Sequence, residues 1–246
     1  GLHALVGPIA QQVYGHPSAR LRVLAVTGTN GKTTVTQWLA QTMPGRCAVI
    51  GTLGAGYPEA MVATGFTTPG AAPYAHRLAG FVEDGAIACA VEASSIGIEE
   101  LRMAGSLVDC AVFTNLTRDH LDYHQTMEAY AAAKARLFHW EGLRAAVINH
   151  DDAFGRALIA GTSAPLVLAY GLSERPADLP ASVQWVGAAS VQTTANGMSA
   201  TLALGDERLP FATRIIGRHN LSNLLAVAAV LVAQGLSPAE IVVHLA

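Results

Sequence analysis

The chain has few cysteines, few charged residues and no long hydrophobic run. Its three cysteines show no CxxC spacing and fall in or beside apolar runs, so we expect buried, reduced thiols and no zinc site. Charged residues make up only 13% of the chain, and a net charge of −3 excludes nucleic acid as the main partner. No apolar stretch approaches the ~20 residues of a membrane span, and no basic-then-apolar leader is found. We therefore expect a cytoplasmic protein with neither nucleic acid nor membrane as partner.

The chain does contain a regular alternation of apolar runs and helical patterns. Hydrophobic residues make up 51% of its 246 residues, enough for a large core. Continuous apolar strands that alternate with helices are typical of a parallel sheet covered on both faces. The expected strands are 23–26, 48–51, 87–91, 108–113, 145–148 and 166–169, and the expected helices are 32–43, 71–85, 126–139, 152–160 and 220–234.

Two regions depart from this alternation. Between residues 182 and 213, short alternating runs are broken by Asn196-Gly197 and Gly205-Asp206, which predicts a small antiparallel sheet. Between residues 51 and 66 we expect a glycine-rich loop. The predicted fold class is α/β: a mostly parallel, P-loop-type sheet flanked by helices, with the small antiparallel sheet appended.

The segment 27–34, Thr-Gly-Thr-Asn-Gly-Lys-Thr-Thr, is a glycine-rich turn between an expected strand and an expected helix. Such a turn leaves backbone N–H groups unpaired at a helix N-terminus, where the helix dipole also favours a phosphate. Lys32 would reach the β and γ phosphates, and the Thr33 hydroxyl would contact Mg²⁺. The general P-loop pattern would have glycine where this chain has Val26. The segment predicts a nucleotide site formed by Gly28, Thr29, Asn30, Gly31, Lys32, Thr33 and Thr34.

Polar residues follow several of the expected strands. Glu92 ends one of them, where a carboxylate can hold Mg²⁺ against phosphates, although an acid that merely begins the next loop would look the same. Ligands of parallel sheets bind at the carboxyl ends of the strands. We therefore expect Gly28, Thr67, Glu92 and Asn115 to lie along one edge of the sheet.

The segment 115–124 is a second dense cluster of polar side chains. His120 lies there with Asp119 and Asp122 on the expected ligand edge, so a metal or substrate role for His120 is favoured over a structural one. Asp122, Tyr123 and His124 need do no more than shape the loop.

Lys134 falls on the apolar stripe of the expected helix 126–139, four residues after Tyr130 and one turn before Phe138. A buried lysine is unfavourable unless it is paired, neutral or chemically modified, although its long stem can also carry the amine to solvent. A neutral amine can take up carbon dioxide as a carbamate, which would turn it into an anionic metal ligand.

The two ends of the chain carry weaker signals. Residues 1–20 hold an apolar-periodic piece and a loop signal, and we interpret them as the tail of a preceding part. Asn220, at the start of the last long apolar helix, is either its N-cap or a ligand of adenine, and position alone leaves the two equal. Ser237-Pro238 then begins one more helix.

Together these motifs resemble the Mur ligases, the ATP-dependent amide-forming enzymes of peptidoglycan assembly, and among them the members that add the third peptide residue. The resemblance extends from about Ser18 to the end of the chain. It is carried by GTNGKTT (28–34), TTP (67–69), EASSIGIEELR (92–102), TNLTRDHLDYH (114–124), EAYAAAKARLF (128–138) and GRHNLSN (217–223). Two departures, Ile96 where many relatives have histidine and Glu100 where many have glutamine, concern substrate contacts rather than the ATP site.

The resemblance implies ATP and Mg²⁺ as cofactors, and a UDP-N-acetylmuramoyl dipeptide and an amino acid as partners. The implied metal ligands are Thr33, Glu92, His120 and a carbamylated Lys134. The implied nucleotide contacts include Asn115 and Asn220 beside the glycine-rich turn. The implied substrate contacts are Thr67, Thr68, Ser94 and Arg102. Catalytic roles fall to Lys32, His120 and Lys134.

The implied reaction activates the carboxylate of UDP-N-acetylmuramoyl-L-alanyl-D-glutamate as an acyl phosphate and joins it to diaminopimelate or lysine. The implied organisation is a linker (1–20), a central ATP-binding domain (21–235, with 182–213 as its antiparallel part) and a last helix (236–246) that leads to a C-terminal domain. Because the flanking domains lie outside this sequence, we expect the chain alone, a monomer, to bind ATP weakly and not to complete ligation.

Two alternatives remain open. One is another amide ligase of the same superfamily, such as a folylpolyglutamate synthetase, against which the TTP and RDHLDYH segments argue. The other is a nucleotide-binding module without catalysis.

Overall fold

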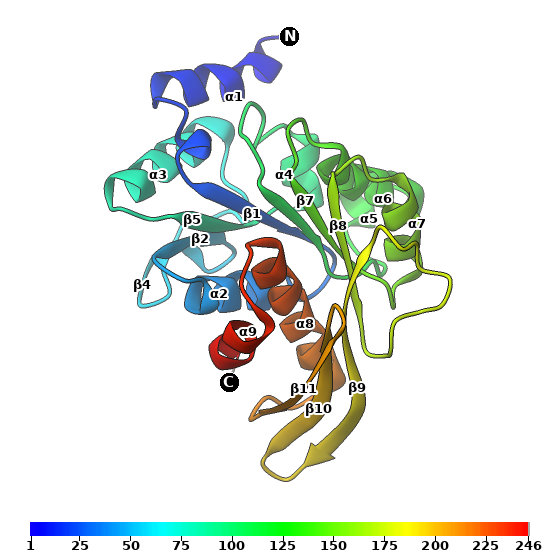
Figure 1. The fold of residues 1–246 in the computed structure, drawn as a ribbon. Coiled ribbons are helices and arrows are strands. Elements are labelled where there is room, and N and C mark those ends of the chain that lie inside the picture. Colours follow the sequence, from blue (N-terminus) through cyan, green and yellow to red (C-terminus); the bar gives the residue numbers. More distant parts are fainter. Residues whose placement is uncertain (246) are drawn as a thin grey trace.

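The structure, a computed structural model, describes residues 1–245 and contains an eleven-stranded sheet. The strand order is β11-β10-β9-β8-β7-β6-β1-β5-β2-β3-β4 (Figure 1). The strands are β1 (Arg22–Thr27), β2 (Cys47–Gly51), β3 (Gly54–Tyr57), β4 (Ala60–Val62), β5 (Ala88–Glu92), β6 (Cys110–Phe113), β7 (Ala145–Asn149), β8 (Leu166–Gly171), β9 (Gln184–Thr194), β10 (Gly197–Leu204) and β11 (Glu207–Thr213). The helices are α1 (Leu2–Val13), α2 (Lys32–Thr42), α3 (Ala71–Glu83), α4 (Ser95–Glu99), α5 (Leu121–His124), α6 (Met127–Ala135), α7 (Ala153–Gly161), α8 (Arg218–Ala233) and α9 (Pro238–Leu245), with 3₁₀ turns at Pro17–Ala19 and Arg136–His139.

The centre of the sheet is parallel, as the sequence predicts. Strands β2, β5, β1, β6, β7, β8 and β9 pair in this order and run in the same direction. Every residue of β2, β5, β6 and β7 is buried, which explains why these strands are continuous apolar runs in the sequence. The predicted parallel strands are confirmed to within about two residues at each end.

Antiparallel strands continue the sheet at both ends. At one end β9, β10 and β11 form the predicted antiparallel section, which projects away from the body of the protein (Figure 1). This section belongs to the main sheet, since β9 pairs with β8 from Leu168↔Gln184 to Gly171↔Gly187. At the other end β2, β3 and β4 are antiparallel, so the loop expected between residues 51 and 66 contains two strands that were not predicted.

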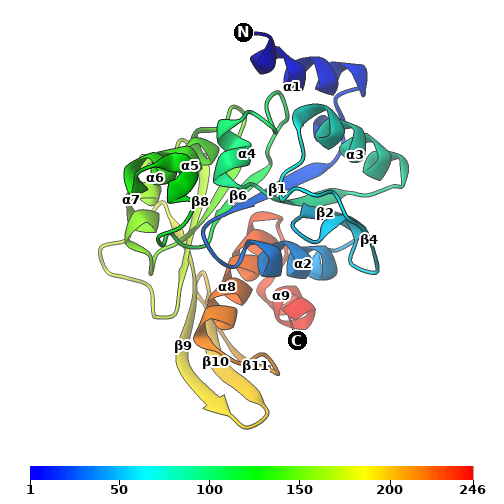
Figure 2. The ribbon, with the colours of Figure 1, turned by 180° about the vertical axis from the view of Figure 1, so that it is seen from behind.

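Helices cover both faces of the sheet, because neighbouring residues of a strand point to opposite sides. In β1, Leu24 and Val26 share a core with α2, α8 and α9, whereas Val23 and Ala25 share a core with α3, α4 and α7. Figures 1 and 2 both show α2, α8 and α9 gathered together, with α3 and α4 away from them. The layers leave the carboxyl ends of β1, β5 and β6 side by side at one edge.

Helix α8 is 16 residues long and buried over most of its length. It packs on β6, β7, β8 and β9 and against α2 and α9, which explains why it is apolar on nearly all sides. No helix in the described part of the chain, α8 included, has the length and apolar character needed to cross a membrane.

Local structure departs from the sequence predictions at four further places. The expected helix 126–139 is divided into α6 and the 3₁₀ turn at Arg136–His139. The short helices α4 and α5 lie where the sequence indicated loops. Helix α8 begins at Arg218 with Gly217 as its N-cap, so the interpretation of Asn220 as the N-cap is wrong.

The three cysteines are buried and free, as expected. Burial raises the pKa of the Cys47 thiol to about 12, and it raises those of Cys89 and Cys110 as well. The thiols therefore stay protonated and pack as small apolar groups.

Candidate nucleotide-binding site

The loop between β1 and α2 surrounds the amine of Lys32. Lys32 Nζ donates hydrogen bonds to the carbonyl oxygens of Gly28 (2.9 Å) and Thr29 (2.8 Å). Burial lowers the pKa of Lys32, whereas the negative charges of Glu92 and Asp119 act to raise it. Since α2 begins at this lysine, its first backbone N–H groups are free to bind a phosphate in the loop.

Gly28 and Gly31 let the loop approach other segments closely. Their φ angles are 146° and 87°, a region that is unfavourable for residues with a side chain. A Cβ atom at Gly28 would overlap the Thr114 hydroxyl, and one at Gly31 would lie 2.5 Å from Asn223 Oδ1. The loop is therefore packed against the segment after β6 and the start of α8.

Replacing Gly31 by alanine should destabilise the protein by about 1–2 kcal/mol and weaken nucleotide binding, because alanine is strained at this φ and would displace Asn223. Gly80→Ala in α3, where an added Cβ meets no atom within 4 Å, is the matched control and should stabilise by about 0.5–1 kcal/mol. Urea unfolding measures both free energies, and titration with a fluorescent ATP analogue measures affinity. Equal affinities of the two variants would contradict this role of Gly31.

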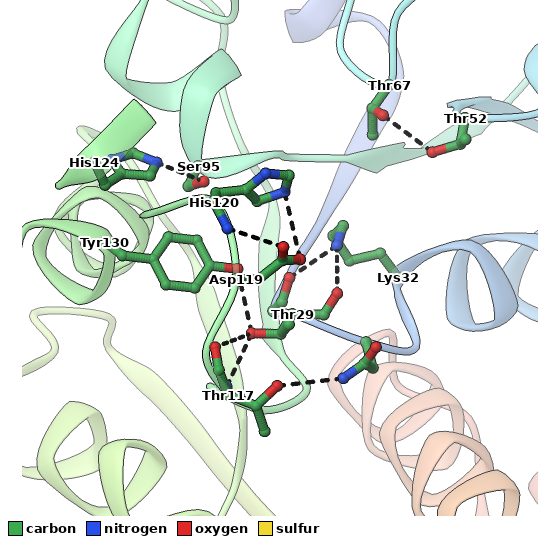
Figure 3. Close-up of polar contacts among 12 residues, drawn as sticks. Thr29, Lys32, Thr52, Thr67, Ser95, Thr117, Asp119, His120, His124 and Tyr130 are labelled. Atoms are coloured by element: carbon green, nitrogen blue, oxygen red, sulfur yellow. Dashed lines mark hydrogen bonds and ion pairs between the residues drawn. The ribbon is translucent and has the colours of Figure 1, made fainter. Parts of the chain in front are cut away.

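Glu92 lies at the carboxyl end of β5 and is 1% exposed. Its Oε1 accepts a hydrogen bond from the Thr52 backbone N–H (2.9 Å), and its Oε2 accepts one from the Thr52 hydroxyl (3.2 Å). The Thr52 hydroxyl is also 3.1 Å from that of Thr67 (Figure 3). Within residues 1–245, Glu92 forms no ion pair. A buried carboxylate of this kind is unfavourable unless a cation shares its site.

Arg102 is held by Thr68 and Glu100. Its Nη1 donates to the Thr68 carbonyl oxygen (2.8 Å), and its Nε and Nη2 donate to Glu100 Oε2 (2.9 and 2.6 Å). These bonds use three of the five guanidinium N–H groups, which leaves one on each terminal nitrogen for a ligand. Thr68 is fully buried, and its hydroxyl donates to the Glu92 carbonyl oxygen (2.7 Å) and accepts from the Ser94 N–H (3.1 Å).

The segment after β6 is fastened to the nucleotide loop by paired hydrogen bonds. Asn115 Oδ1 accepts from the Asn30 N–H (3.0 Å), and Asn115 Nδ2 donates to the Asn30 carbonyl oxygen (3.1 Å). The Thr29 hydroxyl donates to the Thr117 carbonyl oxygen (3.1 Å) and accepts from the Thr117 N–H (2.9 Å; Figure 3). These bonds bring His120, three residues further on, to the same side as the loop.

Lys134 is buried behind the nucleotide loop. It is 1% exposed, which excludes the alternative that its stem carries the amine to solvent. Its Nζ donates to the Gly28 carbonyl oxygen (3.0 Å) and lies 4.3 Å from the centre of the Tyr130 ring. Burial, and then the positive charge of Lys32, lowers the pKa of Lys134 to about 7, so a large neutral fraction exists at neutral pH. Lys32 and Lys134 are the only lysines of the sequence, and both donate to the same carbonyl oxygen.

A cavity of ≈ 740 Å³ lies over the nucleotide loop. The predicted residues that line it are Thr29, Asn30, Gly31, Lys32, Thr33, Thr34, Thr67, Glu92, Ser94, Arg102 and His120. Gly28, Thr68 and Asn115 are bonded to lining residues, and Lys134 is bonded to Gly28. The prediction that Gly28, Thr67, Glu92 and Asn115 share one edge is therefore confirmed.

Asn220 is not among the residues that line this cavity. Its Nδ2 donates instead to the Ile216 carbonyl oxygen (2.9 Å), one turn earlier in the chain. A contact between Asn220 and adenine stays a prediction.

Three residues that support the site were not predicted from the sequence: Thr52, Tyr130 and Asn223. Thr52 binds Glu92, Asn223 lies against Gly31, and the Tyr130 hydroxyl is 3.2 Å from Thr29 Oγ1. Asn223 and Tyr130 did carry a signal, since each places a polar group on the buried side of a helix. Thr52 carried none, because a threonine beside a glycine-rich segment is common in loops.

The donors around the cavity fit a magnesium ion held jointly with phosphate. Glu92 and Thr33 supply hard oxygen atoms and His120 supplies a nitrogen, and all three line the same cavity. In the part of the chain that the structure describes, no three His, Cys, Asp or Glu side chains form a metal-binding group, so the protein alone builds no closed cage. Mg²⁺ usually takes one or two carboxylates together with phosphates and water.

Residues 26–231 match the family model of the Mur ligase middle domain, so the chain belongs to the Mur ligase family. It is 47% identical over 240 residues to the UDP-N-acetylmuramoyl-L-alanyl-D-glutamate--2,6-diaminopimelate ligase of Ralstonia nicotianae, covering 96% of this chain and 47% of that protein. It is 41% identical to the ligase of the same name from Nitrosomonas europaea, with the same coverage. The chain thus spans about half the length of the curated relatives it matches.

Solved structures show the same fold. A structure of UDP-N-acetylmuramoyl-L-alanyl-D-glutamate--2,6-diaminopimelate ligase superposes with a TM-score of 0.85 at 33% identity, covering 98% of this chain and 50% of that one. The apo form of L. casei FPGS superposes with a TM-score of 0.71 at 16% identity, covering 96% of this chain and 65% of that one. At that identity the second likeness shows the fold alone.

Proposed function

We propose that the chain is the ATP-binding middle part of a longer cytoplasmic enzyme that joins UDP-N-acetylmuramoyl-L-alanyl-D-glutamate to 2,6-diaminopimelate. The observation that carries the proposal is the single cavity around which Lys32, Glu92 and Arg102 converge. The names of the curated relatives supply the substrates. Residues 1–20 and 236–246 would connect this central domain to the rest of the enzyme, and the enzyme would act as a monomer.

The side chains of the cavity can stabilise transfer of the γ-phosphoryl group of ATP to the substrate carboxylate. A carboxylate oxygen forms a bond to the γ-phosphorus while the bond to the bridging β–γ oxygen breaks, which gives ADP and an acyl phosphate. Lys32 and the first N–H groups of α2 neutralise the phosphate charge. Thr33, Glu92 and His120 would hold Mg²⁺, which when bound supplies further positive charge beside the phosphates.

In the second step, amide formation, the protein contributes mainly by positioning the amine against the acyl phosphate. The amine of the amino acid attacks the acyl carbon, the bond to the phosphate oxygen breaks, and the amine nitrogen loses a proton as the amide forms. The two free N–H groups of Arg102 suit an anionic group of the muramoyl substrate. Thr67 and Ser94 line the cavity beside it.

Lys134 would act as a carbamate. Its neutral amine would add to carbon dioxide with loss of one proton, which replaces the buried neutral amine by a buried anion. That change would offset the charge of Lys32 and offer a further oxygen ligand to Mg²⁺.

The test is release of ADP by the full-length protein with different acceptor pairs. We expect release only when the UDP-N-acetylmuramoyl dipeptide and diaminopimelate are both present, and little with L-lysine. Release with tetrahydrofolate and glutamate instead would overturn the proposal in favour of a folylpolyglutamate synthetase. ATP binding without any turnover would favour a non-catalytic module. The 246-residue chain alone should give no ligation product.

A further inference from the structure

His124 joins two short helices beside the cavity and has no part in the mechanism above. It is the last residue of α5, its side chain is 1% exposed, and both of its ring nitrogens have partners. Nε2 lies 2.9 Å from Ser95 Oγ (Figure 3), and Nδ1 lies 3.0 Å from Glu99 Oε2. Because Ser95 and Glu99 are the first and last residues of α4, the imidazole ties α5 to α4.

The partners fix the direction of both hydrogen bonds. A carboxylate can only accept, so Nδ1 carries the proton and donates it to Glu99. Nε2 then accepts from the Ser95 hydroxyl. Burial lowers the pKa of His124, which favours this neutral ring over the imidazolium.

Serine, histidine and glutamate in this order are also the groups of a hydrolytic triad, but here they cannot act on a substrate. Ser95 is 1% exposed. Its neighbours Ser94 and Ile96 line the cavity, and Ser95 does not. Since a nucleophile must reach the reacting atom, the arrangement is a structural connection.

The connection matters because α5 is a four-residue helix between two residues with unfavourable backbone angles. His120, just before it, has a φ of 50°, and Gln125, just after it, has a φ of 67°. Both values lie in the left-handed region, which residues other than glycine rarely adopt. So short a helix adds little stability of its own, so contacts from outside must hold this turn in place.

The ring of His124 supplies such contacts. Its centre lies 4.8 Å from that of the Tyr123 ring and 5.2 Å from that of the Tyr130 ring. The Tyr130 ring lies 5.9 Å from that of His120, and its hydroxyl lies 3.2 Å from Thr29 Oγ1. The contacts that hold His124 therefore extend to His120 and to the nucleotide loop.

We propose that His124 is a positioning residue, which holds α5 through Ser95 and Glu99 so that His120 faces the cavity. The proposal rests on the proposed function for the role of His120 toward Mg²⁺ and nucleotide. It assigns His124 no contact with substrate. Helix α4 follows β5 closely, and α5 belongs to the segment after β6. The connection of Ser95, His124 and Glu99 therefore fixes the two sides of the cavity relative to each other.

Variants of His124 and Glu99 in the full-length protein test the proposal. His124→Ala should raise the Mg²⁺ concentration needed for half-maximal ligation about 10- to 100-fold. His124→Gln should restore most of the loss, because its amide can donate to Glu99 and accept from Ser95. Glu99→Gln keeps an acceptor and should be milder than Glu99→Ala. His139→Ala, at an exposed position on the neighbouring 3₁₀ turn, is the control and should change nothing.

Nitrogen-15 NMR of labelled histidines in the same protein gives a readout that does not depend on ligation. The signal of His120 should shift or broaden in His124→Ala and return in His124→Gln. Ser95→Ala should change the shift of His124 Nε2. An unchanged His120 signal, or an unchanged Mg²⁺ requirement, in a folded His124→Ala protein would overturn the proposal. If the unaltered protein failed to ligate, only the proposed function would be contradicted, and the NMR comparison would still decide the role of His124.

Discussion

Lys134→Ala in the full-length protein should lower ligation at least about 100-fold, and formate or acetate should restore part of it. The lysine amine is buried, bonded to the Gly28 carbonyl oxygen, and has its pKa lowered to about 7. Those conditions favour reaction with carbon dioxide, and the shortened side chain leaves room for a small carboxylate. Turnover measured against rising formate concentration gives the extent of rescue.

The pH dependence and a second variant separate the carbamate from a free ammonium. Only the neutral amine reacts with carbon dioxide, so reactivation of a carbon-dioxide-depleted enzyme by bicarbonate should increase as the pH rises through about 7. Lys134→Arg keeps a permanent cation and should stay inactive with formate. Full turnover by Lys134→Ala would contradict a role for the carbamate. Activity of Lys134→Arg would show that the site needs a cation.

Lys32→Ala should lower kcat about 10³-fold, because in the proposed reaction this amine, which the loop holds at the Gly28 and Thr29 carbonyl oxygens, neutralises charge during phosphoryl transfer. The matched control is Gln37→Ala on the same helix, which should keep full activity. Single-turnover measurement of acyl phosphate formation separates this loss from a loss of ATP affinity. A decrease of less than about 10-fold in that step would contradict the role of Lys32.

Lys32→Ala should also change the pKa of Lys134. The positive charge of Lys32 helps to lower the pKa of Lys134, so its removal should raise that pKa and shift reactivation by bicarbonate to higher pH. Reactivation with an unchanged pH profile would show that burial alone sets the neutral fraction.

The parts of the fold that repeat a simple physical pattern could be predicted from the sequence. The buried parallel strands are continuous apolar runs, and Gly28 to Thr34 is a turn whose residue types match its place between a strand and a helix. Lys134 was predicted to be buried because a 3.6-residue period places it on the same side as Tyr130.

The rest depends on contacts between distant segments, which have no local pattern. The strands β3 and β4 are short and consist largely of small residues, so they show no alternation of apolar and polar positions. Thr52 serves the site only because β2 ends beside β5 and brings its N–H within 2.9 Å of Glu92. The bond between His124 and Glu99 joins residues 25 positions apart whose types would suit any surface loop.

Both lysines of the sequence donate to one carbonyl oxygen in the nucleotide loop, so chemical labelling of lysine amines reports on this site. Because no other side-chain amine exists in the sequence, treatment with acetic anhydride and then with hydroxylamine, which removes acetyl esters from hydroxyl groups, leaves acetyl groups only on these two amines and the α-amino group. Intact-mass spectrometry of the acetylated chain would then report the accessibility of the nucleotide loop without a ligation assay. A bound triphosphate that covers Lys32 would be recorded as one acetyl group fewer.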